Sequence, residues 1–111
     1  MQVVGRRQLV AGNWKMNGDK ALVGKMQKIF ATAGLDNMDV VICPPSPYFG
    51  LFDGKLKLGS QNISEFDSGA HTGEVSVAML NEFKCQYSIV GHSERLADNH
   101  DSYELVALKV E

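Results

Sequence analysis

The sequence predicts an α/β protein built on a parallel sheet. Short apolar runs typical of buried strands alternate with segments of helical periodicity along the whole chain. The Asn-Gly pair at Asn17-Gly18 precedes a helical segment, so it does not indicate a β-hairpin. Such alternation requires right-handed crossovers between parallel strands. Periodicity alone leaves two architectures open, a doubly wound sheet and part of a barrel.

The first two strands and the helix between them have the clearest patterns. A strand is predicted at 8–14, and a second, buried strand at 38–43. Asp19 suits the N-cap of the intervening helix, and Gly34 is typical of a position just past a helix end. The predicted buried stripe of this helix is Leu22, Val23, Met26, Ile29 and Phe30.

The second half of the chain repeats the alternation with shorter elements. Ser46-Pro47 is expected to open a short helix. Its predicted apolar side is Tyr48, Leu51 and Phe52. The remaining elements are a third strand at 56–61, a polar, glycine-rich loop at 62–76, a helix at 77–83, a fourth strand at 86–91 and a helix at 102–110. In the last helix the apolar positions are Leu105, Val106 and Leu108, with Glu104 and Lys109 on the polar side.

Length and composition are typical of a small globular protein. Its 111 residues form one domain at most, and we expect residues 1–7 to be a flexible flank. A net charge of −2 without a Lys/Arg block argues against nucleic acid as a partner. No apolar stretch is long enough to span a membrane, and the N-terminus lacks signal-peptide features. A cytoplasmic location is therefore expected.

Two cysteines, Cys43 and Cys85, lie in or beside apolar strand-like runs. We expect two buried free thiols that pack as small apolar side chains, and a disulfide is the alternative that the sequence leaves open. No nearby Cys/His cluster forms a zinc motif. Asp98, His100, Asp101 and Glu104 lie close together but match no metal motif, so a solvated helix entrance is expected there.

Polar groups follow the first strand in the stretch 11–18. In an extended chain Asn13 and Lys15 point to one side, and Trp14 points to the other. A strand end that precedes a helix is where α/β proteins place their chemistry. A lysine there suits a phosphate or an enediolate, although a lone lysine is more often a surface residue.

A second candidate, His92, follows the fourth strand. A histidine there can polarise a carbonyl or move protons, but alone it is more often a packing residue. Ser93 suits a helix N-cap, with Glu94 and Arg95 in the first turn.

Three segments resemble the triosephosphate isomerase family, in its order and near its spacing. They are AGNWKMNG at 11–18, GSQN at 59–62 running on to GAHTGE at 69–74, and IVGHSER at 89–95. The resemblance implies the (β/α)8 TIM-barrel fold, of which this chain covers about the first four β/α units. Residues 1–111 are then the N-terminal half of one barrel domain.

The resemblance also implies roles for residues. Lys15 and Asn13 match the family's substrate-binding residues, and Lys15 and His92 its catalytic ones; there the histidine is the well-known example of a neutral electrophile. Glu94 matches the carboxylate beside the electrophile, with Ser93 in a supporting place. Thr72 and Glu74 match a loop that reaches into the partner of a homodimer. The implied reaction interconverts dihydroxyacetone phosphate and glyceraldehyde 3-phosphate in glycolysis and gluconeogenesis, without cofactor or metal.

The chain departs from the family in several places. No carboxylate within it matches the general base, so we expect little or no activity from the chain alone. Leu96 replaces the second arginine that usually follows Glu94-Arg95 in the family, and His71 replaces the usual aromatic residue. The alternative is a non-catalytic half barrel for self-association or phosphate binding. Its end strands are expected to be open edges, and its apolar inner face should favour association or a partly molten state.

Overall fold

The computed structural model describes residues 7–33, 37–54 and 56–111. The predictions about residues 1–6 and Gly34 lie outside this part. Arg7, the last residue of the predicted flank, forms hydrogen bonds to the second strand of the chain. It donates to the Asp39 carboxylate and to the Met38 carbonyl, each over 3.2 Å.

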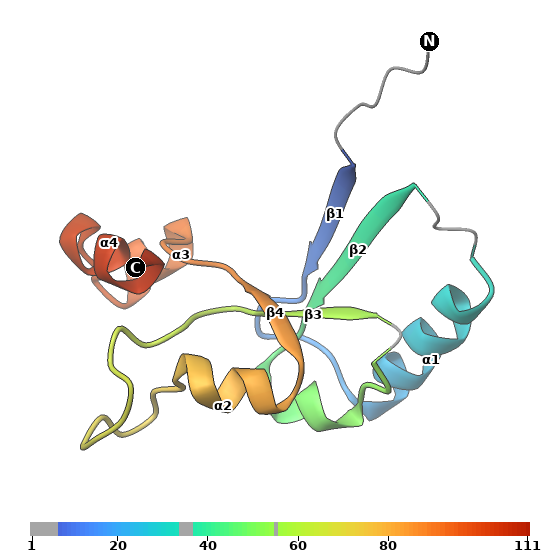
Figure 1. Cartoon of the computed structure of the whole chain (residues 1–111), viewed down its shortest axis with the longest axis horizontal. Helices are drawn as coiled ribbons and strands as arrows, with labels where there is room; N and C mark the ends of the chain where they lie inside the picture. The colour runs from blue at the N-terminus through green and yellow to red at the C-terminus, as the bar shows by residue number, and fades with distance from the viewer. Residues whose placement is uncertain (1–6, 34–36, 55) are drawn as a thin grey trace, which may run out of the picture.

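Four parallel strands form the sheet, as the alternation predicts (Figure 1). They are β1 (Gln8–Asn13), β2 (Met38–Cys43), β3 (Lys57–Ser60) and β4 (Cys85–Ser88). The spatial order, β1-β2-β3-β4, is the chain order. Each crossover therefore steps to the next strand in one direction, as in a barrel, whereas a doubly wound sheet reverses direction.

The helices connect successive strands or follow the last one. They are α1 (Lys20–Ala31), the 3-10 helix η1 (Ser46–Leu51), α2 (Val77–Glu82), α3 (Ser93–Asp98) and α4 (Tyr103–Val110). Helix α1 packs against η1, and α2 packs against β4. Helices α3 and α4 lie together beyond the carboxyl end of β4 (Figure 1). None of the helices in the described ranges is long and apolar enough to cross a membrane.

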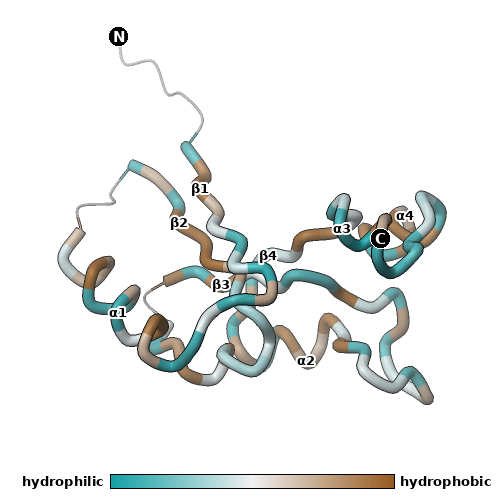
Figure 2. Tube along the Cα trace, turned by 180° about the vertical axis from the view of Figure 1, so that it is seen from behind, coloured by the Kyte–Doolittle hydropathy of each residue, from teal (hydrophilic) through white to brown (hydrophobic). Residues whose placement is uncertain are grey.

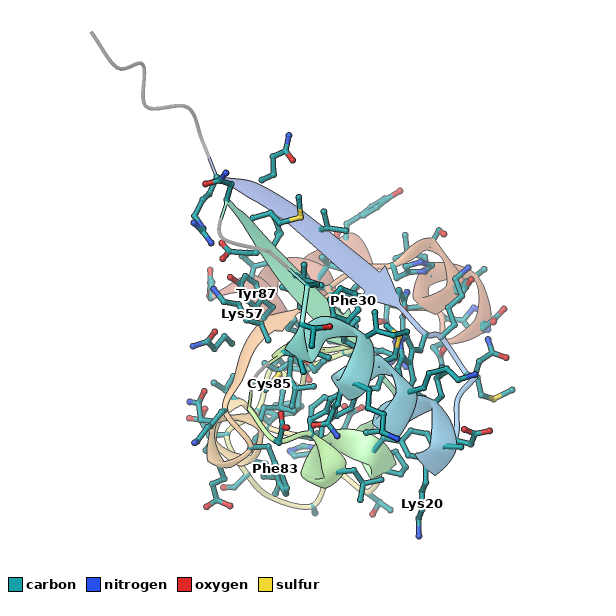
Figure 3. The ribbon with its side chains drawn as sticks, turned by 90° about the vertical axis from the view of Figure 1, so that its right-hand side faces the viewer. Lys20, Phe30, Lys57, Phe83, Cys85 and Tyr87 are labelled. Atoms are coloured by element: carbon teal, nitrogen blue, oxygen red, sulfur yellow. The ribbon has the colours of Figure 1, made fainter. Side chains whose placement is uncertain are left out.

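Helix α1 begins where the sequence predicts, but the predicted burial of one residue of its apolar stripe is wrong. The Asp19 carboxylate accepts the Leu22 N–H over 2.7 Å, which satisfies a donor that the first helical turn leaves free. Val23 is only 2% exposed, whereas Ile29 is 54% exposed. In Figure 3 Phe30 lies next to the strands and Lys20 points away from them.

The core lies between the sheet and the elements around η1 and α2. Its central cluster is Phe49, Leu58, Ile63, Leu80 and Cys85. The prediction for η1 is wrong in detail, because Phe49 is its buried residue and Leu51 is exposed. A 3-10 helix has three residues per turn, so its inward face differs from that of an α-helix. Cys43 and Cys85 are buried free thiols, as predicted.

The ends of three strands differ from their predicted positions. Strand β1 ends at Asn13 rather than Trp14, and β3 spans only Lys57–Ser60. Strand β4 begins one residue early and ends at Ser88. Gly91, which was expected inside this strand, has a φ of 64°. That left-handed backbone is incompatible with a strand, so the chain turns before it reaches His92.

Among the described residues, both edges of the sheet are open and β1 is exposed. Within the described ranges, strand β1 pairs only with β2, and β4 pairs only with β3. Figure 2 shows hydrophobic residues on β2, and the second half of that strand, Val41, Ile42 and Cys43, is buried. On β1, in contrast, Leu9 and Val10 are about half exposed. These features agree with the open edges expected of a half barrel.

Candidate active site

The carboxyl ends of β1, β3 and β4 meet around one cleft of about 360 Å³. It is lined by Asn13, Lys15, Met16, Gln61, Asn62, His92, Glu94, Arg95, Asp98 and Asn99. Parallel strands end at the same edge of a sheet, so residues far apart in the chain gather there. Four of the predicted site residues line this cleft: Asn13, Lys15, His92 and Glu94.

Lys15 reaches the cleft by a route that strand alternation does not predict. Its φ is 55°, a left-handed conformation that costs a non-glycine residue about 1–3 kcal/mol. The side-chain oxygen of Asn13 accepts the Lys15 N–H over 2.9 Å. The prediction that an extended chain aligns Asn13 and Lys15 is therefore wrong. They share the cleft because the chain turns after Asn13.

Lys15 and Glu94 form an ion pair across the cleft. The Lys15 Nζ lies 2.6 Å from Glu94 Oε1, and both side chains are about half exposed. The hydrogen bond from Lys15 is the main reason that the pKa of Glu94 lies below its ordinary value. The charge of Lys15 acts in the same direction, against a partial loss of hydration. The pair places one cation and one carboxylate in the cleft at neutral pH.

His92 is the N-cap of α3, a role that the sequence analysis assigned to Ser93. The His92 Nδ1 accepts the Glu94 N–H over 3.1 Å. Ser93 is instead the first helical residue and is exposed. A ring nitrogen that accepts a hydrogen bond carries no proton, so in this arrangement the imidazole is neutral with its proton on Nε2. The Nε2–H group remains as a donor for a ligand.

Sequence reasoning missed Gln61 and Asn62, which also line the cleft. Gln61 donates to the carbonyls of Lys15 and Cys43 over 2.8 and 2.9 Å. Asn62 accepts from Lys109 Nζ over 2.8 Å. One signal was present, because these two polar residues follow β3 just as His92 follows the end of β4.

Comparison with known proteins identifies the family. A family profile described as Triosephosphate isomerase matches residues 8–111. The chain belongs to the triosephosphate isomerase family. Its similar relatives include the triosephosphate isomerases of Herminiimonas arsenicoxydans, 52% identical over 94% of this chain and 44% of the relative, and of Alkalilimnicola ehrlichii, 46% identical over 96% and 45%. That of Colwellia psychrerythraea is 48% identical over 95% and 45%.

The chain thus spans a little under half the length of these curated relatives. Its four parallel strands and their helices form half of the family's α/β barrel, as the resemblance predicts. Barrels of this kind carry their active sites at the carboxyl ends of the strands. The cleft that holds Lys15, His92 and Glu94 lies at that end.

Asp101, Arg95 and Lys109 form an ionic cluster behind the cleft. Asp101 contacts Arg95 Nε over 3.2 Å and Lys109 Nζ over 3.4 Å, and the side chains of Asp101 and Lys109 are only 5% and 3% exposed. The prediction of a solvated helix entrance is therefore wrong for Asp101, and Lys109 does not lie on an exposed face. Burial raises the pKa of Asp101, but the two cations outweigh it, so the pKa lies below the ordinary value.

The other predicted residues lie elsewhere. Thr72 and Glu74 are exposed on the loop between β3 and α2 and do not line the cleft. His71 stacks on Phe66 in the same loop, with ring centroids 3.8 Å apart. His100 is exposed at the turn between α3 and α4. Among the described residues, no group of three or more His, Cys, Asp or Glu side chains is placed to hold a metal ion.

Proposed function

We propose that the whole protein is a triosephosphate isomerase, which interconverts dihydroxyacetone phosphate and glyceraldehyde 3-phosphate through an enediolate. Glycolysis and gluconeogenesis are then its metabolic setting. The observation that carries this proposal is the meeting of Lys15, His92 and Glu94 in one cleft at the carboxyl end of the sheet. Membership of the family and the names of the relatives support it.

In this proposal Lys15 is the cation of the site. Its ammonium group neutralises the substrate phosphate and the negative charge that develops on the enediolate oxygens. Asn13 supports it by fixing the Lys15 N–H. Glu94 holds the ammonium group on the cleft side until substrate binds, since the ion pair spans 2.6 Å.

His92 is the proposed electrophile. Its Nδ1 is occupied by the Glu94 N–H, so its Nε2–H is the group that donates to the substrate carbonyl oxygen. Triosephosphate isomerases are the established example of a neutral histidine in this role. Ser93, as the first residue of α3, has no contact that assigns it more than a place in the helix that presents His92.

The general base is proposed to lie in a part of the protein outside these residues. No carboxylate of the 111-residue chain matches the family's base. Removing a general base typically lowers the rate by ~10²–10⁴-fold. The chain by itself is therefore expected to bind and polarise substrate better than it transforms it.

An assay of a fused protein tests the proposal. The chain is joined to the segment of the Herminiimonas arsenicoxydans relative that follows its matched region, and isomerisation of glyceraldehyde 3-phosphate is measured. Lys15→Ala should lower kcat/KM by ~10²–10⁴-fold, as expected when transition-state charge loses its stabiliser. Lys20→Ala, which removes an exposed lysine of α1, is the matched control and should leave kcat/KM unchanged. A folded fusion without Lys15-dependent activity would contradict the proposal.

We also propose that the whole protein is a homodimer and is cytoplasmic. The loop that carries Thr72 and Glu74 projects from the body of the structure (Figure 1). The Phe66–His71 stack and the bond from the Ser64 N–H to the Val75 carbonyl give it a defined shape, which suits a docking element. The free thiols of Cys43 and Cys85 agree with a reducing compartment.

A second candidate function is a self-associating half barrel without catalysis. It is favoured by the apolar side chains of β1, where Leu9 and Val10 are each about half exposed. The same fused protein separates the two functions, because only the first requires activity that Lys15→Ala abolishes.

A further inference from the structure

Gln61 connects the ends of three strands through a single amide group. It follows directly after β3, and its Nε2 donates to the carbonyls of Lys15 (2.8 Å) and Cys43 (2.9 Å). A primary amide has two N–H donors, so both are used. Cys43 is the last residue of β2, and its carbonyl also accepts the Trp14 N–H that follows β1. Gln61 therefore ties the turn after β1 to the ends of β2 and β3.

The two peptide groups on either side of the Lys15 Cα are both held by side chains. Asn13 accepts the Lys15 N–H over 2.9 Å, and Gln61 donates to the Lys15 carbonyl. Between them Lys15 has a φ of 55°, which a residue with a side chain rarely adopts. Such a conformation persists only where the surroundings hold it.

We propose that Gln61 is a positioning residue that holds the Lys15 backbone so that the ammonium group enters the cleft. This inference rests on the function proposed above. The Lys15 side chain is 52% exposed, so packing does not fix its direction. A lysine side chain is long and flexible, and the direction of its first bonds is set by the backbone. From this backbone Lys15 Nζ reaches within 2.6 Å of Glu94 Oε1.

The titration of the Glu94 carboxyl group reports the position of Lys15 without any activity. It is followed by NMR in the 111-residue chain. Methionine resembles glutamine in length but has no N–H donor, so Gln61→Met should raise the pKa of Glu94 toward its ordinary value. Lys15→Ala should do the same. The double variant should show no further rise, and Gln86→Met, on exposed β4 sequence, should show none. His92, the other titratable side chain near Glu94, is present in every variant.

An unchanged Glu94 titration in a folded Gln61→Met chain would overturn the proposal. If Gln61→Met does not fold, Gln61→Asn replaces it, since this variant keeps the amide but draws it back by one methylene. The Glu94 pKa should again rise in Gln61→Asn. If neither variant gives a folded circular-dichroism spectrum, Gln61 is a structural residue and the proposal is wrong.

A double-mutant cycle in the fused protein gives a second, kinetic test. Gln61→Met should lower kcat/KM by ~10–100-fold, as expected when a catalytic group is displaced by about an ångström. In the Lys15→Ala background the same change should have no effect, because Gln61 acts through Lys15. Equal losses in both backgrounds would overturn the positioning role. An inactive fusion would instead overturn the proposed function, while the Glu94 titration still decides where Lys15 lies.

Discussion

The cleft depends on contacts of single residues that join distant parts of the chain. Lys15 has a left-handed backbone conformation, which hydrogen bonds to the side chains of Asn13 and Gln61 hold in place. His92 follows β4 and caps the N-terminus of α3. The buried carboxylate of Asp101 forms ion pairs with Arg95 and Lys109. Each of these residues does a structural task that also decides where a polar atom of the cleft lies.

Asp101→Asn tests the buried cluster at this scale. Removing one member of a buried ion pair leaves a charge without compensation, which costs ~3–5 kcal/mol. We expect a loss at the lower end of this range at pH 7, since Asn62 still accepts from Lys109. Urea unfolding followed by circular dichroism measures it. Asp67→Asn, at an exposed loop carboxylate, is the matched control and should change stability little.

The pH dependence of the same variant has a defined sign. The folded pKa of Asp101 lies below its ordinary value of 3.8, so its stabilising contribution is present above about pH 4 and is lost as the pH falls through the folded pKa. The wild-type chain should therefore lose stability on acidification below pH 4 more steeply than Asp101→Asn. If the free energy of unfolding fell equally steeply below pH 4 in the wild type and in Asp101→Asn, the carboxylate of Asp101 would not stabilise the fold.

At the scale of elements, glycine has opposite effects in a strand and a helix. A Cβ on Gly59 in β3 would lie 2.6 Å from Cys43 Sγ and 3.2 Å from Val41 Cγ1. A Cβ on Gly24 in α1 would meet nothing within 4 Å. The absence of a side chain is thus required by packing between strands at Gly59, whereas at Gly24 it only adds conformational freedom to the unfolded chain.

The pair Gly59→Ala and Gly24→Ala turns this difference into a prediction. Gly59→Ala should destabilise the fold by ~1–3 kcal/mol through overpacking. Gly24→Ala should stabilise it by up to about 1 kcal/mol through helix propensity. Midpoints of urea unfolding measure both changes, and shifts of the same sign in the two variants would contradict the assigned packing.

The sequence predicts elements better than contacts, for a physical reason. Local periodicity and capping residues are enough to place α1 after Asp19 and to alternate strands with helices. The pairing of Asp101 with Lys109, and of Gln61 with Lys15, depends on tertiary packing that no local pattern encodes. Ser93 has the better cap propensity, but the backbone turn at Gly91 places His92 at the cap instead.

At the scale of the whole molecule, the sheet has two unpaired edges and an exposed projecting loop among its described parts. A sheet edge presents free backbone donors and acceptors to any neighbouring strand. Strands β1 and β4 are these edges, and Leu9 and Val10 add apolar surface to the first. The proposed barrel covers these surfaces in the whole protein, and the proposed dimer covers the loop around Thr72.

Thr72→Lys tests the dimer proposal. A charge placed in a desolvated contact weakens association, so in the fused protein the dimer dissociation constant should rise at least tenfold, as measured by sedimentation equilibrium. Ala21→Lys adds the same charge on an exposed position of α1 and should leave the constant unchanged. A fused protein that remains a monomer at high concentration would contradict the proposal at once.

The central claim is that the cleft polarises a carbonyl with His92, and kcat/KM for glyceraldehyde 3-phosphate in the fused protein tests it most directly. His92→Asn should lower kcat/KM by ~10²–10⁴-fold. His100→Asn, at the exposed turn after α3, should leave it within about twofold of wild type, since that side chain does not line the cleft. Wild-type kcat/KM in a folded His92→Asn variant would contradict the account.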